Sequence, residues 1–263
     1  MKPFIKWAGG KRWLLENQNI KFPAFQGRYI EPFLGGGAVF FHVAPQEAIL
    51  ADMNSKLILT YQAIKSDWQS VELLLKLYQN KHSKDFYYQE RKRTPLEPLE
   101  QAAQFIYLNR TCFNGLYREN LNGQFNVPIG TNQKVLRRDD DFAGVSRMLQ
   151  SAELRVSDFS DTILEARAGD LVFVDPPYTV MRDNGGFLKY NQKVFSWQDQ
   201  ERLKIDIVAA LNRGSRVVMT NADHDSIREL YAELGSPSIL YRNSLMASSI
   251  SFRGQYSELL YTF

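Results

Sequence analysis

The feature that most constrains the fold of this chain is an apolar run that ends in a carboxylate and two prolines. Leu171-Val172-Phe173-Val174 leads directly into Asp175-Pro176-Pro177-Tyr178. A short, continuous apolar run is typical of a buried parallel strand, and the prolines fix the backbone just beyond its carboxyl end. Ligands bind at that end of the strands in open α/β sheets. The sequence therefore predicts a strand that carries a rigid polar corner to a binding site.

The chemistry of this corner suits a planar group that bears an NH₂. The Asp175 carboxylate and the Pro176 carbonyl are hydrogen-bond acceptors. The two prolines lack an N–H, so the backbone at positions 176 and 177 offers no donor. The two acceptors would take the two N–H hydrogens of such a group while the Tyr178 ring stacks on its face. A proline-stiffened turn with a capping aspartate is the alternative interpretation.

Strands and helices alternate on both sides of this run. We expect strands at residues 28–31, 48–51, 154–156, 171–174, 216–220 and 259–262, and helices from residue 38 and over 161–168, 197–211 and 225–234. This alternation predicts an α/β fold with a doubly wound, mostly parallel sheet. Residues 1–56 and 151–263 would together form one discontinuous, cofactor-binding catalytic domain.

Residues 57–150 break this alternation and predict an inserted, mainly helical subdomain. Two apolar helix faces are expected, one from Leu73, Leu74, Leu77 and Tyr78 and one from Ala102, Phe105, Ile106 and Leu108. An Asn- and Gly-rich stretch follows, with a hairpin expected near 111–128 because Asn114-Gly115 is typical of a two-residue hairpin turn. Residues 76–138 hold eleven Lys or Arg and five Asp or Glu. A polyanionic partner and a solvated helix surface both fit that excess.

Composition excludes several classes of protein. The lone Cys112 rules out an internal disulfide framework, and packing is its expected role. No apolar run approaches the roughly 20 residues that span a bilayer, and the first residues lack the apolar core of a signal peptide. We therefore expect a cytoplasmic protein with no membrane partner. The three histidines show no metal-ligand spacing, so no metal is expected.

A glycine loop, Gly35-Gly36-Gly37, joins the first strand to a helix, and Asp52 ends the next strand. Three contiguous glycines do not match the spaced glycines of nicotinamide-binding proteins, whereas an acid at position 52 suits ribose hydroxyls. Glu31-Pro32-Phe33 can offer a carboxylate to an amino group and an aromatic face to a sulfonium. S-adenosylmethionine is thus the expected ligand, with a tight helix–strand turn as the alternative.

Seven short motifs occur in a fixed order along the chain. They are Lys6-Trp7-Ala8-Gly9-Gly10-Lys11, Glu31-Pro32-Phe33-Leu34-Gly35-Gly36-Gly37, Ala51-Asp52-Met53-Asn54, Leu108-Asn109-Arg110-Thr111-Cys112-Phe113-Asn114-Gly115-Leu116-Tyr117-Arg118, Gly123-Gln124-Phe125-Asn126-Val127-Pro128, Asp175-Pro176-Pro177-Tyr178 and Ser257-Glu258-Leu259-Leu260. In this order the chain closely resembles the Dam-type, alpha-group DNA adenine-N6 methyltransferases, essentially from end to end.

The resemblance implies S-adenosylmethionine as methyl donor and adenine N6 in double-stranded DNA as acceptor, with a monomeric, prokaryotic or phage-encoded enzyme. The cofactor contacts that it implies are Trp7, Ala8, Gly9, Lys11, Phe33, Gly35, Asp52, Asp158, Phe159 and Asp175. The target-base contacts are Asp175, Pro176 and Tyr178. The DNA contacts are Phe113, Asn114, Leu116, Arg118 and Pro128, with Arg118 as the reader of a guanine through O6 and N7.

The chemistry of the acceptor requires base flipping, because N6 is paired inside a duplex and is a poor nucleophile. Residues 113–118 agree with a GATC site, but after Pro128 the chain departs from many relatives: Thr131-Asn132-Gln133-Lys134 follows Gly130 without a proline. GATC or a related short site is therefore expected. An RNA or protein glutamine N-methyltransferase remains an alternative, although those enzymes usually carry Asn before Pro-Pro. A non-catalytic DNA-binding module is another, although it would be expected to have lost the glycine loop or Asp175.

Overall fold

A computed structural model of the protein describes residues 1–17, 20–120, 122–181, 195–243 and 255–263. The strands are β1 (Tyr29–Glu31), β2 (Ala48–Asp52), β3 (Ala152–Val156), β4 (Leu171–Val174), β5 (Arg216–Ala222), β6 (Ser238–Asn243) and β7 (Gln255–Thr262). The α-helices are α1 (Arg12–Asn17), α2 (Ala38–Val43), α3 (Ser55–Lys81), α4 (Lys84–Lys92), α5 (Pro98–Thr111), α6 (Phe142–Leu149), α7 (Phe159–Leu164), α8 (Trp197–Asn212) and α9 (Asp225–Tyr231).

The strands form a mixed sheet in the order β3-β2-β1-β4-β5-β7-β6, which confirms the predicted α/β class. β4 pairs in parallel with β1 and with β5, whereas β7 runs antiparallel to both β5 and β6. Strand order reverses between β1 and β4. Open α/β sheets bind ligands outside the carboxyl ends of their strands at such a switch point.

The chain divides into two compact units, and each is described by itself. Unit 1 comprises residues 1–12, 34–46 and 50–156, and unit 2 comprises residues 13–33, 47–49 and 157–263. The expected helical subdomain of residues 57–150 lies within unit 1, and its role in target recognition stays a prediction.

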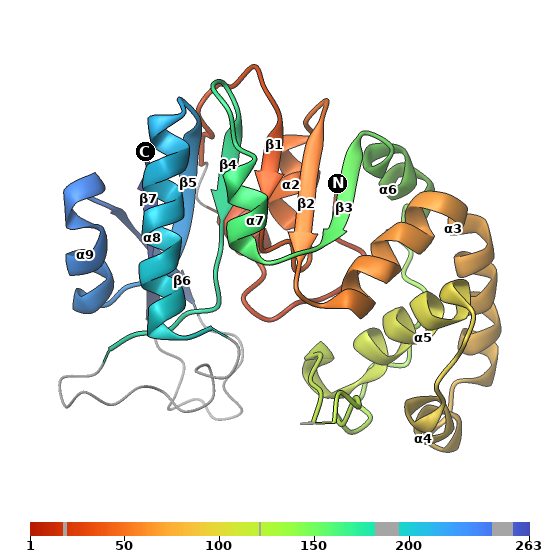
Figure 1. Ribbon diagram of the computed structural model, residues 1–263. Coiled ribbons are helices and arrows are strands. Elements are labelled where there is room, and N and C mark those ends of the chain that lie inside the picture. The colour runs from red at the N-terminus through yellow and green to blue at the C-terminus, as the bar shows by residue number, and fades with distance from the viewer. Residues whose placement is uncertain (18–19, 121, 182–194, 244–254) are drawn as a thin grey trace. The chain divides into compact units, whose positions relative to one another are not determined.

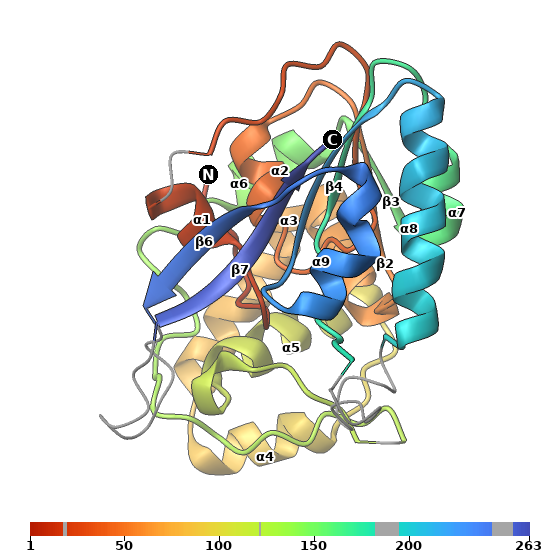
Figure 2. The same cartoon turned by 90° about the vertical axis from the view of Figure 1, so that its left-hand side faces the viewer.

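The core of unit 2 lies between the sheet and α8. Figure 1 shows α7 and α8 on the same side of β4 and β5, and Figure 2 shows this arrangement from the side. Leu203, Ile207 and Ala210 of α8 are buried against apolar side chains of β4 and β5, as the helical periodicity predicted. A capping box fixes the start of α8: the Ser196 hydroxyl accepts from the Asp199 N–H, and the Asp199 carboxylate accepts from the Ser196 N–H.

The helices of unit 1 correct one prediction. In α3, Leu73 and Leu77 are 59% and 47% exposed, so the expected apolar face is wrong at these two positions; Tyr78 is buried as expected, together with Val71 and Leu75. The two sets have similar helical spacing, and periodicity alone does not choose between them. α3 also breaks at Asp67, whose backbone is not helical. The expected face of α5 is confirmed, since Ala102, Phe105, Ile106 and Leu108 are all buried.

Three elements differ from the sequence expectation. α7 begins at Phe159 and ends at Leu164, earlier than the helix expected over 161–168. It starts there because the Asp158 side chain caps it by accepting from the Ser160 N–H. α1 and β6 were not anticipated. In β6 exposed and buried side chains alternate: Ile239 and Tyr241 are exposed, and Leu240 between them is buried. This is the period-two pattern of a strand with one buried face.

Candidate active site and recognition segment

The Asp175 corner lies at the carboxyl end of β4 in unit 2. Because Val174 pairs with Met219 of β5, the next residues of the two strands lie side by side, and the Thr220 hydroxyl donates to Asp175 Oδ1 at 2.7 Å. Pro176, the next residue, is buried. A strand end, a neighbouring hydroxyl and a proline therefore restrict the orientation of the Asp175 side chain.

Tyr178 is held by a carboxylate on another strand. Its hydroxyl donates to Glu258 Oε2 at 2.6 Å, and Glu258 lies on β7 with only 3% of its surface exposed. Burial raises the pKa of Tyr178 well above its ordinary value, and the charges of Asp175 and Glu258 raise it further. The phenol is therefore protonated and remains a hydrogen-bond donor at any physiological pH.

A second phenol and carboxylate pair lies on β1, beside β4. The Tyr29 hydroxyl donates to Glu31 Oε2 at 2.8 Å, and both residues are buried. Burial also raises the pKa of Tyr29 well above its ordinary value, with further contributions from Glu31 and Asp175. The carboxyl ends of β1 and β4 thus carry two carboxylates, Glu31 and Asp175. Each accepts a hydrogen bond from a hydroxyl group.

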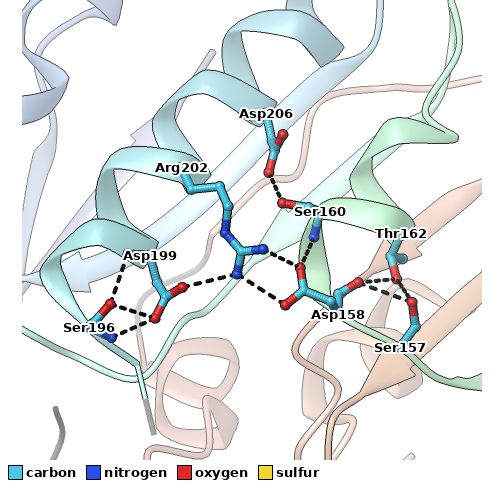
Figure 3. A network of polar contacts seen from close by, with 8 residues as sticks. All are labelled: Ser157, Asp158, Ser160, Thr162, Ser196, Asp199, Arg202 and Asp206. Atoms are coloured by element: carbon cyan, nitrogen blue, oxygen red, sulfur yellow. Dashed lines mark hydrogen bonds and ion pairs between the residues drawn. The ribbon is translucent and has the colours of Figure 1, made fainter. Parts of the chain in front are cut away.

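Asp158, which with Phe159 is a predicted contact of the cofactor, lies in the polar network of Figure 3. Arg202 of α8 donates to both Asp158 oxygens at 3.1 and 3.0 Å and to Asp199 at 3.0 Å. Its guanidinium lies 4.2 Å from the Phe159 ring centroid, and Phe33 stacks on the same ring at 5.4 Å. The Phe159 side chain is 4% exposed, so its ring serves first as packing between its neighbours.

The glycine loop in unit 1 is built around Trp7. Gly35 has a φ of +48°, and a Cβ there would lie 2.7 Å from Trp7 Cδ1. Its N–H donates to Asp52 Oδ2 at 3.0 Å, and its carbonyl accepts from the Tyr61 hydroxyl at 3.1 Å. Glycine at position 35 is therefore required both by the left-handed backbone and by the contact with the indole.

Asp52 closes the glycine loop onto the end of β2. Its Oδ1 accepts from the Asn54 N–H at 2.9 Å, as Oδ2 does from Gly35. A carboxylate oxygen can accept two hydrogen bonds, so each oxygen retains capacity for one hydroxyl donor. Burial raises the pKa of Asp52, and the two backbone hydrogen bonds oppose that shift. Such a carboxylate suits a vicinal diol.

The segment that follows Trp7 turns sharply. The Gly10 N–H donates to the Trp7 carbonyl at 3.1 Å, Ala8 is exposed, and Gly9 has a φ of +76°. The Lys11 ammonium donates to the Gly9 carbonyl at 2.8 Å, and the residue is 3% exposed. Lys11 is thus part of the structure of this turn, and interpreting it as a solvated lysine would be wrong.

An aromatic stack links Trp7 to the basic segment of unit 1. Trp7 stacks on Phe105 at 6.2 Å and on Tyr117 at 5.6 Å between ring centroids, and Tyr117 contacts Phe125 at 5.2 Å. The neighbouring Lys6 ammonium donates to the Asn114 carbonyl at 2.5 Å. The N-terminal segment therefore supports the loop that contains the predicted DNA contacts.

The hairpin expected near 111–128 occurs, but its tip is not at Asn114-Gly115. Those two residues form a tight turn with φ values of +57° and +64°. The antiparallel arms pair Cys112 with Ile129 and Glu119 with Phe125, and beyond these pairs the Asn120 N–H donates to the Gln124 carbonyl. The Asn114-Gly115 pair correctly predicted a tight turn. The expectation that this turn forms the tip of the hairpin was wrong.

The predicted DNA contacts lie on this loop and are accessible to different degrees. Phe113 is 54% exposed, Asn114, Arg118 and Pro128 are also exposed, and Leu116 is half-buried. The Arg118 Nε donates to Asn126 Oδ1 at 2.9 Å.

A polar cavity of about 250 Å³ lies beside the Asn114 turn, lined among others by Lys6, Asn109, Arg110, Asn114, Asn132 and Arg137. Arg110 is structural: its side chain is fully buried, donates to Asp140 at 2.6 and 2.7 Å and also bonds to two backbone carbonyls. Lys6 and Arg137 also bring cationic side chains to the cavity, whereas the charge of Arg110 is paired with Asp140.

The family model of the D12 class N6 adenine-specific DNA methyltransferases matches residues 7–247 of the chain. The chain belongs to this family. As expected from the resemblance, it is an adenine-specific DNA methyltransferase. A type II methyltransferase of Lactococcus lactis subsp. cremoris is 34% identical over all of this chain and 95% of its own length. The DNA adenine methylase of Escherichia coli K12 is 31% identical over 98% of this chain and 94% of its own length.

One phage relative is much longer than this chain. The DNA N-6-adenine-methyltransferase of Escherichia phage P1 is 36% identical over 89% of this chain but only 31% of its own sequence.

In the methyltransferase, the predicted site residues fall into two sets. Unit 1 carries Trp7, Ala8, Gly9, Lys11, Gly35, Asp52, Phe113, Asn114, Leu116, Arg118 and Pro128, and unit 2 carries Phe33, Asp158, Phe159, Asp175, Pro176 and Tyr178. Thr220 and Glu258, which hold Asp175 and Tyr178, were not predicted as site residues. Glu258 lies just before the terminal strand expected at 259–262, and the observed β7 extends back to Gln255 and includes it.

Two findings bear on metals and membranes. Among the described residues, no group of three or more His, Cys, Asp or Glu side chains is placed to hold a metal ion. None of the helices in the described parts of the chain is long and apolar enough to cross a membrane.

Proposed function

We propose that this methyltransferase transfers a methyl group from S-adenosylmethionine to N6 of an adenine flipped out of duplex DNA, within GATC or a related short site. The observation that carries the proposal is the Asp175 corner at the switch point of the sheet. There Thr220 holds the carboxylate and Glu258 holds the tyrosine.

In this proposal Asp175 and the Pro176 carbonyl accept the two N6 hydrogens, which draws electron density onto the nitrogen and favours its tetrahedral form. Tyr178 stacks on the adenine ring. Flipping costs a few kcal/mol, and stacking on an aromatic side chain returns ~1–3 kcal/mol. The corner therefore offsets much of the cost of unpairing while it activates the amino group. Direct attack needs no covalent intermediate with the enzyme.

The donor set of unit 1 fits the ribose of S-adenosylmethionine, because both oxygens of Asp52 can accept one further hydroxyl hydrogen bond. Trp7, Ala8, Gly9 and Lys11 are the proposed contacts of the methionine part, and Gly35 is a proposed contact on the sulfonium side. In unit 2, Phe33, Asp158 and Phe159 are the proposed adenine and sulfonium contacts. The bound cofactor supplies an electrophilic methyl group.

The DNA partner is proposed from the loop and its charge. Phe113, Asn114, Leu116, Arg118 and Pro128 are the proposed groove contacts, and the cationic cavity beside them suits a phosphate oxygen. Arg118 fits a guanine because a guanidinium can donate two hydrogen bonds to O6 and N7. We further propose that the protein acts as a monomer in the cytoplasm of its host.

The test is transfer of tritiated methyl groups from S-adenosylmethionine to a duplex with one GATC site. The controls are a duplex in which 2-aminopurine, which lacks the N6 amino group, replaces the adenine, an RNA of the same sequence, and a protein extract. We expect label only in the adenine duplex. Label in RNA or protein, but not in DNA, would favour the alternative substrates, and no label in any of them would favour a non-catalytic module.

The variant Asp175→Ala should abolish transfer while S-adenosylmethionine binding, measured by calorimetry, persists. Asp161→Ala is the matched control, because Asp161 is an exposed acid on α7 of the same unit. Wild-type activity in Asp175→Ala would refute the assignment of the corner.

The recognised sequence is tested by methylation-sensitive sequencing of DNA from a host that lacks adenine methylation of its own and expresses the protein. Methylated adenines confined to GATC or a one-base variant are expected. A different consensus would refute the site and leave the proposed chemistry intact.

A further inference from the structure

Glu258 is a buried carboxylate that the proposed chemistry does not use. It lies on β7, opposite Ala222 of β5 and Leu240 of β6, with 3% of its surface exposed. Burying a carboxylate is costly unless it accepts strong hydrogen bonds. A neutral residue at this position would form the same strand with a smaller desolvation cost. A role of the carboxylate in the site would account for this cost.

Glu258 accepts a hydrogen bond from Tyr178, the aromatic residue of the corner. Tyr178 donates its hydroxyl at 2.6 Å, a length typical of a charge-assisted hydrogen bond, which is roughly twice as strong as a neutral one. The backbone before Tyr178 is fixed by two prolines, whereas its side chain has two rotatable bonds. The bond to Glu258 at the far end of the phenol, together with a hydrogen bond with the Thr220 side chain, restricts that remaining freedom.

The same edge of the sheet fixes the other member of the corner. Thr220 lies two residues before Ala222 on β5 and donates to Asp175, and Ala222 is the residue that pairs with Glu258. β5 and its neighbour β7 therefore hold the carboxylate and the ring of the corner from adjacent positions. A shift of either strand would change both together.

We propose that Glu258 is a positioning residue that sets the plane of the Tyr178 ring for stacking on the target base. The inference rests on the proposed function, in which Tyr178 stacks on a flipped adenine. In this proposal Glu258 acts through the tyrosine and contacts neither the cofactor nor the target base. Its removal therefore leaves cofactor binding intact and lowers the rate of the methyl-transfer step.

The experiment compares wild-type protein with Glu258→Ala, Glu258→Gln, Tyr178→Phe and the double variant Tyr178→Phe/Glu258→Ala. Single-turnover methyl transfer gives the rate of the chemical step, and calorimetry gives the affinity for S-adenosylmethionine. A duplex with 2-aminopurine at the target position reports stacking, because the fluorescence of that base rises on flipping and is quenched by an aromatic neighbour.

We expect Glu258→Ala to slow single-turnover transfer by about 10- to 100-fold, the value of a hydrogen bond to a charged group, with cofactor affinity unchanged. Glu258→Gln should recover most of the rate, because its amide oxygen still accepts from the phenol. Tyr178→Phe should lose about as much as Glu258→Ala, and the double variant no more than either. Unquenched 2-aminopurine in Glu258→Ala would agree with a misplaced ring.

Three outcomes would overturn the inference. In the first, losses multiply in the double variant, which would mean that Glu258 acts independently of Tyr178. In the second, Glu258→Gln is as slow as Glu258→Ala at an unchanged urea midpoint. In the third, Glu258→Ala transfers at the wild-type rate. Any of these with an active wild type would leave the proposed function standing, whereas an inactive wild type would refute both.

Discussion

Replacing Gly35 by alanine tests the idea that the glycine loop exists to let the backbone approach Trp7. Two separate costs are built into this position. The residue has a φ of +48°, and an added Cβ would lie 2.7 Å from Trp7 Cδ1 and 3.3 Å from Nε1. Real Cβ atoms do not approach other atoms to 2.7 Å, so the indole or the loop must shift.

The magnitude follows from adding the two costs. Left-handed backbone costs an L-residue roughly 1–2 kcal/mol, and overpacking by one carbon costs about 1–3 kcal/mol. Gly35→Ala should therefore lower the free energy of unfolding by ~2–5 kcal/mol. The displaced indole stacks on Phe105 and Tyr117, so cofactor affinity should fall as well.

The matched control is Gly123→Ala. Gly123 has a φ of +69°, but the nearest atom to its added Cβ, a Glu119 oxygen, is 4.0 Å away. Only the backbone cost remains there, about 1–2 kcal/mol. Urea denaturation with unchanged m-values measures both losses.

A second mutation isolates the contact itself. In a Trp7→Ala background the atoms that the Cβ would touch are gone, so Gly35→Ala should then cost no more than Gly123→Ala. Equal losses for Gly35→Ala and Gly123→Ala in the wild-type background, or no coupling between positions 7 and 35, would refute the reasoning.

Three further predictions concern other parts of the molecule. Burial raises the pKa of Asp52, so its carboxylate is protonated at a higher pH than that of an ordinary aspartate; the affinity for S-adenosylmethionine should fall as the pH falls through that pKa, and calorimetry of Asp52→Asn should show weaker binding without this dependence. A flat wild-type profile would contradict it. Arg110→Ala leaves the buried carboxylate of Asp140 without its bidentate partner and should cost ~3–5 kcal/mol of stability; a loss below about 1 kcal/mol in urea denaturation would show that the pair is dispensable. Arg118→Ala should weaken DNA binding by ~1–3 kcal/mol and relax specificity at one base pair, measured by methylation of duplexes substituted at each position of the site. A uniform loss at all positions would instead identify a phosphate contact.

Local features of the fold could be predicted because neighbouring residues encode them. The apolar run of β4 and its two prolines specified a buried strand with a rigid end, since both effects act within a few residues. The Asn114-Gly115 turn followed in the same way from residues that tolerate positive φ.

Choices between equivalent patterns needed the tertiary structure. Leu73 and Leu77 have the spacing of a buried helix face, yet they are exposed, because the packing of α3 against its neighbours uses Val71, Leu75 and Tyr78. Likewise, turn chemistry does not reveal which residues face each other across a hairpin: Glu119 pairs with Phe125, so the tip lies beyond Asn114.

The sequence by itself predicted a rigid corner of hydrogen-bond acceptors at Asp175-Pro176-Pro177-Tyr178 that suits a planar amino group, because the acceptors and the rigidity of that corner are covalent properties of four consecutive residues. Only the tertiary structure decided which residues hold the side chains of Asp175 and Tyr178 in place. Thr220 is 45 residues from Asp175, and Glu258 is 80 residues from Tyr178. Their contacts depend on the order and register of β4, β5 and β7, which are set by the burial of whole strands and not by any local pattern.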